Sequence, residues 1–281
     1  MLQSVSFVGG GVMAEAMIRR LLDRGLVAAG RITVSGPRAE RRAELAARHG
    51  VVATADNAEA ARAGDVVVLA IKPQMLARVM PELRGHLRDG QLVVSILAGG
   101  RIATLTEGLA HPAVVRAMPN TPAQIGEGLT VWTATPAVGE ERRAQAQAVF
   151  AALGREVYVD DERFLDMATA VSGTGPTYVF MVLEALIDAA VHLGFPRHLA
   201  HDLVIETMRG SVAYAQASDR HPAELRNFVT SPGGTSAEAI YQMEKGALRT
   251  VLSKAVWAAY QKSRLLGESV GKADPRHPVD A

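Results

Sequence analysis

The chain has no cysteine, almost no net charge and no long uninterrupted apolar run. Without cysteine it can form neither disulfide bonds nor thiolate metal sites, and it has no cysteine nucleophile. Its 30 basic and 29 acidic residues give a formal net charge of +1, so net charge does not support binding to nucleic acid or to an anionic membrane. The longest broadly apolar stretch covers residues 178–195. Because Glu184, Asp188 and His192 interrupt it, this stretch is a poor membrane span.

A signal peptide and a metal-binding pattern are also missing. The chain begins Met-Leu-Gln-Ser without a basic segment and enters a strand-like run at Val5, so we expect a cytoplasmic protein. The eight histidines include no H-x-x-x-H pair on a predicted helix, and His198 and His201 fit a solvated helix start, so we expect no metal. The composition, 48% hydrophobic and 21% charged over 281 residues, is typical of a packed chain of one large or two ordinary domains.

The first 160 residues alternate short β-branched runs with helical patterns. Residues 66–71 are continuously apolar, as expected for a strand covered on both faces. This alternation predicts an α/β fold with a Rossmann-type, doubly wound parallel sheet. The predicted strands are 5–8, 32–35, 51–53, 66–71, 92–97, 114–117, 129–133 and 156–159, and the predicted helices are 12–24, 38–49, 75–86, 102–109 and 140–153.

The second half of the sequence contains helical patterns and no strand pattern. We therefore predict a dinucleotide-binding domain over residues 1–160, an all-α domain over 161–270 and a flexible tail over 271–281. The helix predicted over 176–194 is apolar on several faces. Either the helices bury these faces against one another or a second subunit covers them, and we favour the second subunit. The other predicted helices are 164–172, 199–217 and 236–267.

A glycine-rich turn joins the first predicted strand to the first predicted helix. Gly9, Gly11 and Ala14 fit the G-x-G-x-x-G/A dinucleotide fingerprint, in which the glycines permit a tight turn and close approach of the pyrophosphate. Free amides at the helix start bind that pyrophosphate. The alternative is that the glycines only make a turn. The residues expected at the pyrophosphate are Gly9, Gly10, Gly11, Val12 and Met13.

The end of the second predicted strand indicates which nucleotide binds. An NAD site usually carries a carboxylate there, but this chain has Ser35 and Arg38 and no carboxylate until Glu40. Both groups can hydrogen-bond a 2′-phosphate, so NADPH is favoured and NADH is second. Alternatively, Arg38 only begins a solvated helix. Further cofactor contacts are expected at other strand ends, namely Ala70, Ile71, Lys72, Pro73, Ala98, Gly99 and Asn120. We read Lys72 as a strand-end lysine rather than a catalytic one.

Two segments rich in glycine and hydroxyl groups lie in the second half, at residues 172–176 and 231–236. The second one precedes a long helical pattern, so it fits either a capped helix start or an anion site. Glycines inside a helical domain cost stability, which suggests a close approach of backbone to something. The segments comprise Ser172, Gly173, Thr174, Gly175 and Pro176, and Ser231, Pro232, Gly233, Gly234, Thr235 and Ser236.

Together these motifs resemble the Δ1-pyrroline-5-carboxylate reductase family, which completes proline biosynthesis. The resemblance extends to about Gly267 and depends on residues 7–14, 69–73, 118–122, 170–178 and, most specifically, 229–240. It implies an NADPH-binding N-terminal domain and a helical C-terminal domain that forms an intertwined homodimer, and dimers of this family often assemble into decamers. The small-molecule substrate would be a cyclic imino acid.

The resemblance also implies roles for individual residues. Amides and hydroxyls of Gly234, Thr235 and Ser236 would hold the substrate carboxylate, with Ser231 and Gly233 in the same loop. The segment 172–176 would line the substrate pocket, and Asn57 would approach the adenosine ribose. The sequence departs from the family at Val12, where asparagine is usual, and at Ser236, where threonine is usual.

The chemistry of a cyclic imine explains why few catalytic side chains are needed. Hydride transfer to a protonated imine neutralises a cation, whereas hydride transfer to a carbonyl creates an oxyanion that needs a donor. The protein must then chiefly place the cofactor against the imine carbon, and we assign Ser236 as the one catalytic hydroxyl.

Two other interpretations stay open at this point. A 3-hydroxyacid dehydrogenase needs a lysine after the domain junction, but the sequence has no lysine between Lys72 and Lys245. A non-catalytic NADP(H)-binding protein would not need the second glycine turn. Consumption of NADPH on addition of the cyclic imine distinguishes these interpretations.

Overall fold

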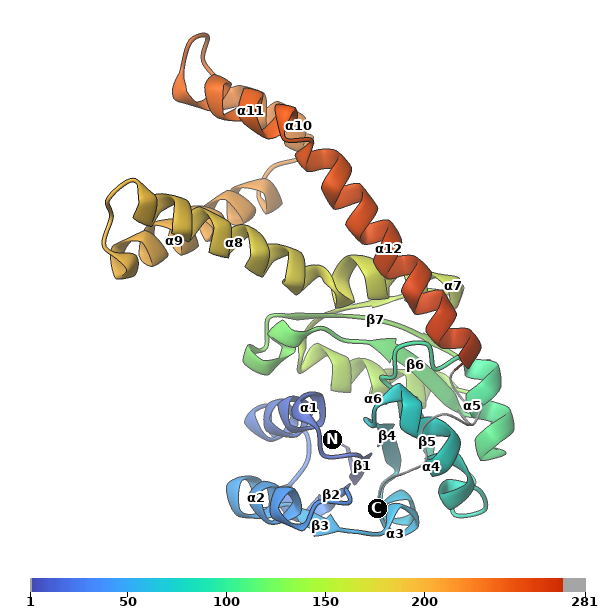
Figure 1. The fold of residues 1–281 in the computed structure, drawn as a ribbon. Coiled ribbons are helices and arrows are strands. Elements are labelled where there is room, and N and C mark those ends of the chain that lie inside the picture. Colours follow the sequence, from blue (N-terminus) through green and yellow to red (C-terminus); the bar gives the residue numbers. More distant parts are fainter. Residues whose placement is uncertain (1, 270–281) are drawn as a thin grey trace. The chain divides into compact units, whose positions relative to one another are not determined.

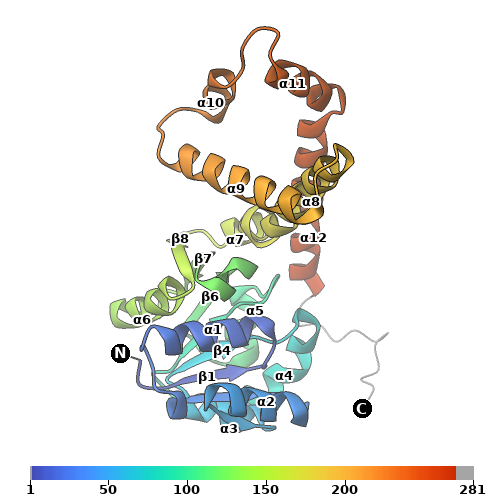
Figure 2. The same ribbon diagram turned by 90° about the vertical axis from the view of Figure 1, so that its left-hand side faces the viewer.

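The structure is a computed structural model and describes residues 2–269, so the predicted tail at 271–281 lies outside the described residues. The chain forms two compact units (Figures 1 and 2). The first contains the residues up to Thr174 and those from Ala258 on, and the second contains Gly175–Trp257. Strands end before residue 161, as the predicted domain boundary requires, but residues 161–174 pack with the sheet. Leu165 is buried there, which explains why the first unit extends to Thr174 and not only to residue 160.

The first unit is built on one eight-stranded sheet of order β3-β2-β1-β4-β5-β6-β7-β8 (Figure 1). Its central strands are uniformly buried, as in Val66–Leu69. The strands are β1 Val5–Val8, β2 Ile32–Ser35, β3 Val52–Thr54, β4 Val66–Leu69, β5 Leu92–Ser95, β6 Val114–Met118, β7 Gly128–Ala134 and β8 Gly154–Tyr158.

The first six strands are parallel, as predicted, but β7 runs antiparallel to β6. The prediction of an entirely parallel sheet is therefore wrong for β7 and β8. Only a short 3₁₀ turn, η3 (Thr121–Ile125), separates β6 from β7, whereas a parallel pair needs a crossover of a dozen or more residues. Helix α6 (Glu140–Ala151) supplies such a crossover before β8, and β8 is accordingly parallel to β7.

Helices cover both faces of this sheet (Figures 1 and 2). Residues of α1 and α6, among them Ile18 and Phe150, form one apolar core with Val68, while residues of α4 and α5 form the other with Val67. Neighbouring residues of β4 thus enter opposite cores, which confirms the doubly wound architecture. Besides α6, the helices of the first unit include α1 Val12–Asp23, α2 Ala39–His49, α3 Asn57–Ala63, α4 Leu76–Leu83, α5 Ile102–Leu109 and α7 Arg163–Ala168.

The second unit is helical, as predicted. It comprises α8 Gly175–His192, α9 Arg197–Gln216, α10 Pro222–Phe228, α11 Thr235–Lys245 and the first part of α12 Leu248–Ser269. The single helix predicted over 236–267 is broken, because Ala247 adopts a left-handed φ of 54° between α11 and α12. At the predicted interruption, residues 172–176, the helical run is distorted but not ended, with a bend at Thr174 between a π turn and α8. Residues 163–192 form one helical stretch that widens into a π turn, η4, at Thr169–Gly173.

Apolar side chains of the second unit are largely uncovered within one chain. Ala200 is its only buried hydrophobic residue among those the structure describes. Helix α8 has no buried residue at all, although α8 and α9 pack together (Figure 2). Residues 163–192 meet the length and composition of a membrane span, which is weak evidence for one. The exposed large apolar residues of α8 are Val179, Phe180, Met181 and Leu186.

Polar substitutions on this face test whether a second subunit covers it. Met181 and Leu186 are 65% and 44% exposed, so serine at both positions costs little within one chain. We expect M181S/L186S to convert an oligomer into a less stable monomer, as measured by sedimentation velocity and thermal unfolding. Ile125→Ser, at an equally exposed position of the first unit, is the control. A wild-type chain that sediments as a well-folded monomer would contradict the expectation.

Candidate functional site

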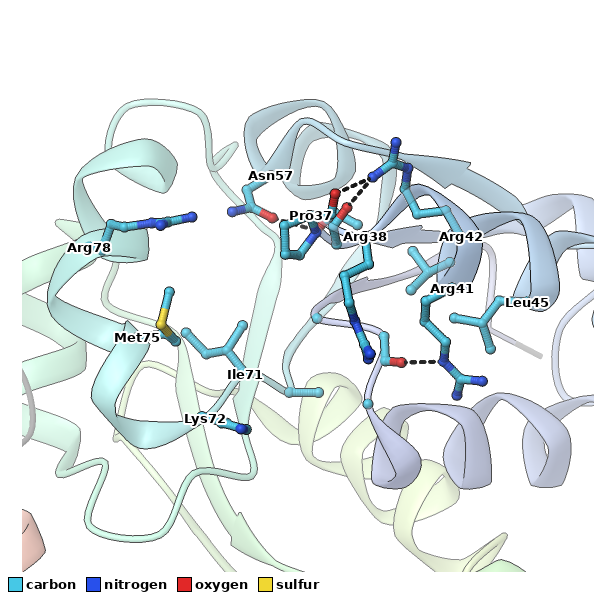
Figure 3. A pocket seen from close by; sticks show the side chains of 17 residues that line it. Pro37, Arg38, Arg41, Arg42, Leu45, Asn57, Ile71, Lys72, Met75 and Arg78 are labelled. Carbon is cyan, nitrogen blue, oxygen red and sulfur yellow. Dashed lines mark hydrogen bonds between the residues drawn. The ribbon is translucent and has the colours of Figure 1, made fainter. Parts of the chain in front are cut away.

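A cavity of about 270 Å³ lies at the carboxyl ends of β1, β2 and β4 (Figure 3). The sheet order reverses between β1 and β4, and ligands of doubly wound sheets bind at such a switch point. The cavity is lined by Gly9, Gly10, Gly11, Val34, Ser35, Gly36, Pro37, Arg38, Arg41, Arg42, Leu45, Asn57, Ala70, Ile71, Lys72, Met75 and Arg78.

The glycine turn forms the floor of this cavity. Gly9 has a φ of 105°, and a Cβ atom on it would lie 2.7 Å from the Ala70 carbonyl oxygen, so no other residue fits. A Cβ atom on Gly10 would lie 2.8 Å from Leu45. Gly11 is the N-cap of α1 and makes no side-chain capping bond. The first N–H groups of α1 therefore remain available to an anion.

Positive charge dominates the cavity wall. Five of its lining side chains are cationic, and none of the described lining residues is a carboxylate. Arg38 comes from the β2–α2 loop, Lys72 follows β4 and Arg78 belongs to α4, so the cations surround the opening (Figure 3). This arrangement suits a ligand with several phosphates, because each phosphate can accept charge-assisted hydrogen bonds.

The arginines of the β2–α2 region differ in how they are held. Arg41 donates from Nε to the Gly10 carbonyl oxygen at 2.9 Å and pairs with Glu15 and Glu44. Arg42 donates to the carbonyl oxygens of Gly36 and Pro37. Within the described part of the chain the Arg38 guanidinium has no hydrogen bond or ion pair, so it is the arginine of this loop whose side-chain donors are all available to a ligand.

A chain of hydrogen bonds fixes the amide of Asn57 at the cavity edge. The Ser35 hydroxyl donates to Asn57 Oδ1 at 2.6 Å, and Asn57 Nδ2 donates to Glu82 at 2.6 Å. Ser35 is fully buried, and its hydroxyl is engaged by Asn57. Ser35 and Asn57, which lie 22 residues apart in the sequence, are thus joined at the cavity.

The carboxylate of Glu15 holds the cations behind the glycine turn. Partial burial raises its pKa, but hydrogen bonds from Arg41, His49 and Arg48 outweigh this and lower the pKa to about 2. Glu15 is therefore ionised at neutral pH and keeps Arg41 against the Gly10 carbonyl.

Several of the predicted cofactor residues line the cavity and others do not. Those in the lining are Gly9, Gly10, Gly11, Ser35, Arg38, Asn57, Ala70, Ile71 and Lys72, and those outside it are Val12, Met13, Pro73, Ala98, Gly99 and Asn120. Gly99 has a separate reason to be glycine, since a Cβ atom on it would lie 2.7 Å from the Gly267 nitrogen. Val12 and Met13 begin α1, where backbone N–H groups matter more than side chains.

The cavity residues that the sequence did not predict are Val34, Gly36, Pro37, Arg41, Arg42, Leu45, Met75 and Arg78. Gly36 and Pro37 lie between Ser35 and Arg38, so their place in the chain was a usable signal. Arg78 carries no such signal, because only the packing of α4 brings it to the cavity.

The predicted substrate segment at 172–176 spans the division between the two units. Its hydroxyl groups are occupied locally: Ser172 donates to the Ala168 carbonyl oxygen at 3.0 Å and Thr174 to that of Thr169 at 2.8 Å. A Cβ atom on Gly173 would lie 2.7 Å from the Met118 methyl group, so this glycine also permits close packing.

The second predicted substrate segment forms the turn before α11. Gly233 has a φ of 69°, and the Gly234 N–H donates to the Ser231 carbonyl oxygen at 3.0 Å. Gly234 is the N-cap of α11, and no side chain caps it. The hydroxyls of Thr235 and Ser236 therefore do not serve as N-caps, and the helix start keeps donors for an anion. Among the described residues no group of three or more potential ligands could hold a metal ion.

Two family models match the chain. Residues 4–99 match the model described as NADP oxidoreductase coenzyme F420-dependent, and residues 162–266 match the one described as pyrroline-5-carboxylate reductase dimerisation. The first match contains the glycine turn and the cavity. The second contains the helices whose apolar faces are exposed in a single chain.

Curated relatives and solved structures agree with these matches. A pyrroline-5-carboxylate reductase of Synechocystis is 40% identical over 94% of this chain and 98% of its own length, and that of Pseudomonas aeruginosa is 39% identical over 95% and 98%. A Plasmodium falciparum pyrroline carboxylate reductase solved with NADP bound has a TM-score of 0.88 at 30% identity, covering 94% of this chain and 98% of its own. A Coxiella burnetii pyrroline-5-carboxylate reductase has a TM-score of 0.84 at 34% identity, covering 95% and 99%.

The Glu15 cluster generates a pH-dependent stability difference. A carboxyl group with a lowered pKa stabilises the folded state above its unfolded pKa, and this contribution fades as the pH falls toward the folded pKa. We expect Glu15→Gln to lower the free energy of unfolding by about 1–2 kcal/mol at pH 7, after allowance for solvent screening. The difference should shrink between the ordinary pKa of 4.5 and about 2. Urea unfolding from pH 7 to pH 3 measures it, with the exposed Glu107→Gln as control. A difference that stays constant over this range would contradict the assignment.

Proposed function

The chain belongs to the pyrroline-5-carboxylate reductase family, and from this premise we propose that it reduces Δ1-pyrroline-5-carboxylate to L-proline with a hydride from NADPH, the last step of proline biosynthesis. The observation that carries the cofactor part is the cavity at the glycine turn, where five cationic side chains and no carboxylate stand among the described lining residues. Such side chains can give charge-assisted hydrogen bonds to the phosphates of a dinucleotide. The residues present therefore fit an NADP(H) cofactor.

We propose that NADPH is preferred over NADH. The Arg38 guanidinium has no partner among the described residues, and Arg38 follows the strand end where an NAD site usually carries a carboxylate. A free guanidinium there can bind a 2′-phosphate bidentately, and a carboxylate would repel it. NADH lacks this phosphate, so it would serve as the weaker donor.

The residues of the glycine turn and of α11 divide the chemical work. When bound, the cofactor supplies the hydride. Backbone N–H groups of α1 would hold the pyrophosphate, and those at Thr235 and Ser236 would hold the substrate carboxylate, because both helix starts lack side-chain caps. The N–H of the protonated imine would donate to the Ser236 hydroxyl oxygen. Because hydride transfer removes a positive charge from the imine, no strong acid is needed, and the product amine can take its next proton from water.

We propose a homodimer formed through the helical half. The support is the exposed apolar surface of α8, together with the match of residues 162–266 to a dimerisation model. Assembly into a decamer is implied by the family resemblance and stays a prediction, as do the cytoplasmic location, the absence of nucleic-acid, membrane and metal partners, and the division of roles between residues 1–160 and 161–270.

The proposed reaction is tested by following NADPH absorbance after addition of the five-membered cyclic imine to the purified protein. We expect NADPH to be consumed and proline to appear in equal amounts. Oxidation of a 3-hydroxy acid with NADP⁺ but no turnover of the imine would replace the proposal with a dehydrogenase. Binding of NADPH without any turnover would replace it with a cofactor-binding protein.

Arg38→Ala tests the cofactor preference. Loss of a charge-assisted contact to the 2′-phosphate should raise KM for NADPH by about 10–100-fold. KM for NADH should change by less than about threefold, since NADH makes no such contact. Arg24→Ala, at an exposed arginine at the end of α1, is the control. Equal increases for the two cofactors would remove Arg38 from phosphate recognition.

Ser236→Ala tests the proposed catalytic hydroxyl. We expect kcat/KM for the cyclic imine to fall by about 10–100-fold, the effect of losing one charge-assisted hydrogen bond in the transition state. The control is Ser211→Ala, which removes an exposed hydroxyl that bonds only its own helix, α9. An unchanged kcat/KM in the Ser236 variant would exclude this hydroxyl from the mechanism.

A further inference from the structure

One side of β6 and of the residues after it contacts a single helical stretch. Arg116, Met118 and Asn120 alternate along the chain, and Asn120 keeps an extended conformation, so the three side chains project from the same side. Arg116 bonds to Glu162 and Asp166, and Asn120 bonds to the carbonyl of Ser172. The segment 116–120 therefore contacts the stretch 162–173 near the beginning of that stretch, through Arg116, and near its end, through Asn120.

Arg116 anchors the beginning of this stretch. Its side chain is 3% exposed and lies 2.9 Å from Glu162 Oε1 and 2.7 Å from Asp166 Oδ1. A buried guanidinium is stable only when its charge and its donors are matched, so both carboxylates are required. Ser263 of α12 also donates to Asp166, which adds a third element to the same anchor.

The oxygen and the nitrogen of the Asn120 amide each make a hydrogen bond within the first unit. Its Oδ1 accepts from the Leu129 N–H at 2.9 Å, and its Nδ2 donates to the Ser172 carbonyl oxygen at 3.1 Å. The Leu129 N–H can be matched only by the amide oxygen, which fixes the orientation of the amide. Asn120 is not among the residues that line the cofactor cavity.

The carbonyl of Ser172 needs such a donor for a reason visible in the sequence. In an α-helix it would accept from the residue four positions later, which is Pro176 and has no N–H. The proline ring would also clash with that carbonyl in regular α geometry. The chain widens instead into the π turn at Thr169–Gly173, closed by a bond from the Thr174 N–H to the Thr169 carbonyl oxygen at 2.8 Å. Such turns are rare and often lie at functional sites.

We propose that Asn120 is a positioning residue for the substrate segment: it supplies the hydrogen bond that Pro176 cannot give to the Ser172 carbonyl, and so fixes the π turn that presents Ser172–Pro176. This assignment rests on the proposed function for the role of that segment. It replaces the expectation from the sequence that Asn120 contacts the cofactor.

Asn120→Asp tests the assignment with one atom exchanged. Aspartate keeps the acceptor for the Leu129 N–H but places an oxygen against the Ser172 carbonyl. The matched control is Gln91→Glu, because the buried Gln91 amide likewise accepts from the Arg88 N–H and donates to the Ala61 carbonyl. Amide hydrogen exchange over residues 163–192 reports on the turn, while KM for the cyclic imine and Kd for NADPH report on the site.

We expect N120D to exchange faster over 163–192, to raise KM for the imine about tenfold and to leave Kd for NADPH within about twofold, whereas Q91E should change none of these three values. Weaker NADPH binding with an unchanged KM for the imine would overturn the proposal in favour of a cofactor contact. Unchanged exchange over 163–192 would also overturn it. The exchange comparison tests whether Asn120 fixes the π turn, and it does so whether or not the wild type reduces the imine. A wild type that does not reduce the imine would contradict the proposed function, not this assignment.

A second variant covers the case in which N120D does not fold. Pro176→Ala restores an N–H that can reach the Ser172 carbonyl, so N120D/P176A should regain folding and slow exchange over 163–192. If P176A folds and the double variant does not, Asn120 acts through another contact and the proposal is wrong.

Discussion

The close approach of Gly9 to the Ala70 carbonyl is the contact on which the cofactor region depends. A Cβ atom on Gly9 would lie only 2.7 Å from that oxygen, and the residue has a φ of 105°, so this position accepts only glycine. The turn lets β1 and β4 stay paired up to Val8 and Leu69 while the chain reverses into α1. It therefore aims the N-terminal amides of α1 at the cavity and places the strand ends of β2 and β4 around it.

Around this turn some charged side chains form ion pairs or hydrogen bonds within the protein, and others are available to a ligand. Glu15 fixes Arg41 behind the glycine turn, and Arg42 bonds to loop carbonyls, so neither is fully available. Arg38 is available, at the position where a 2′-phosphate would lie in a site of this fold. The helical half differs, because its apolar side chains are largely exposed within one chain and form no core of their own.

Much of the fold could be predicted from the sequence, because its strands are continuous apolar runs and its first turn has a fingerprint. The direction of β7 could not be predicted in this way, because an apolar pattern does not show whether a strand runs parallel or antiparallel to its neighbour. The short link after Met118 was nevertheless a usable sign. Helices α3 and α10 were missed because each has only seven residues, too few for a periodic signal. Arg78 and the bond between Asn120 and Ser172, 52 residues apart, depend on tertiary packing and leave no local trace.

The affinity of the protein for NADPH relative to NADH tests most directly whether the cavity is built for a phosphorylated dinucleotide. Isothermal titration at low and at high salt gives both dissociation constants. We expect NADPH to bind at least about tenfold more tightly than NADH at low salt, with a smaller ratio at high salt because salt screens the contact between Arg38 and the phosphate. Equal affinities, or tighter binding of NADH, would contradict this.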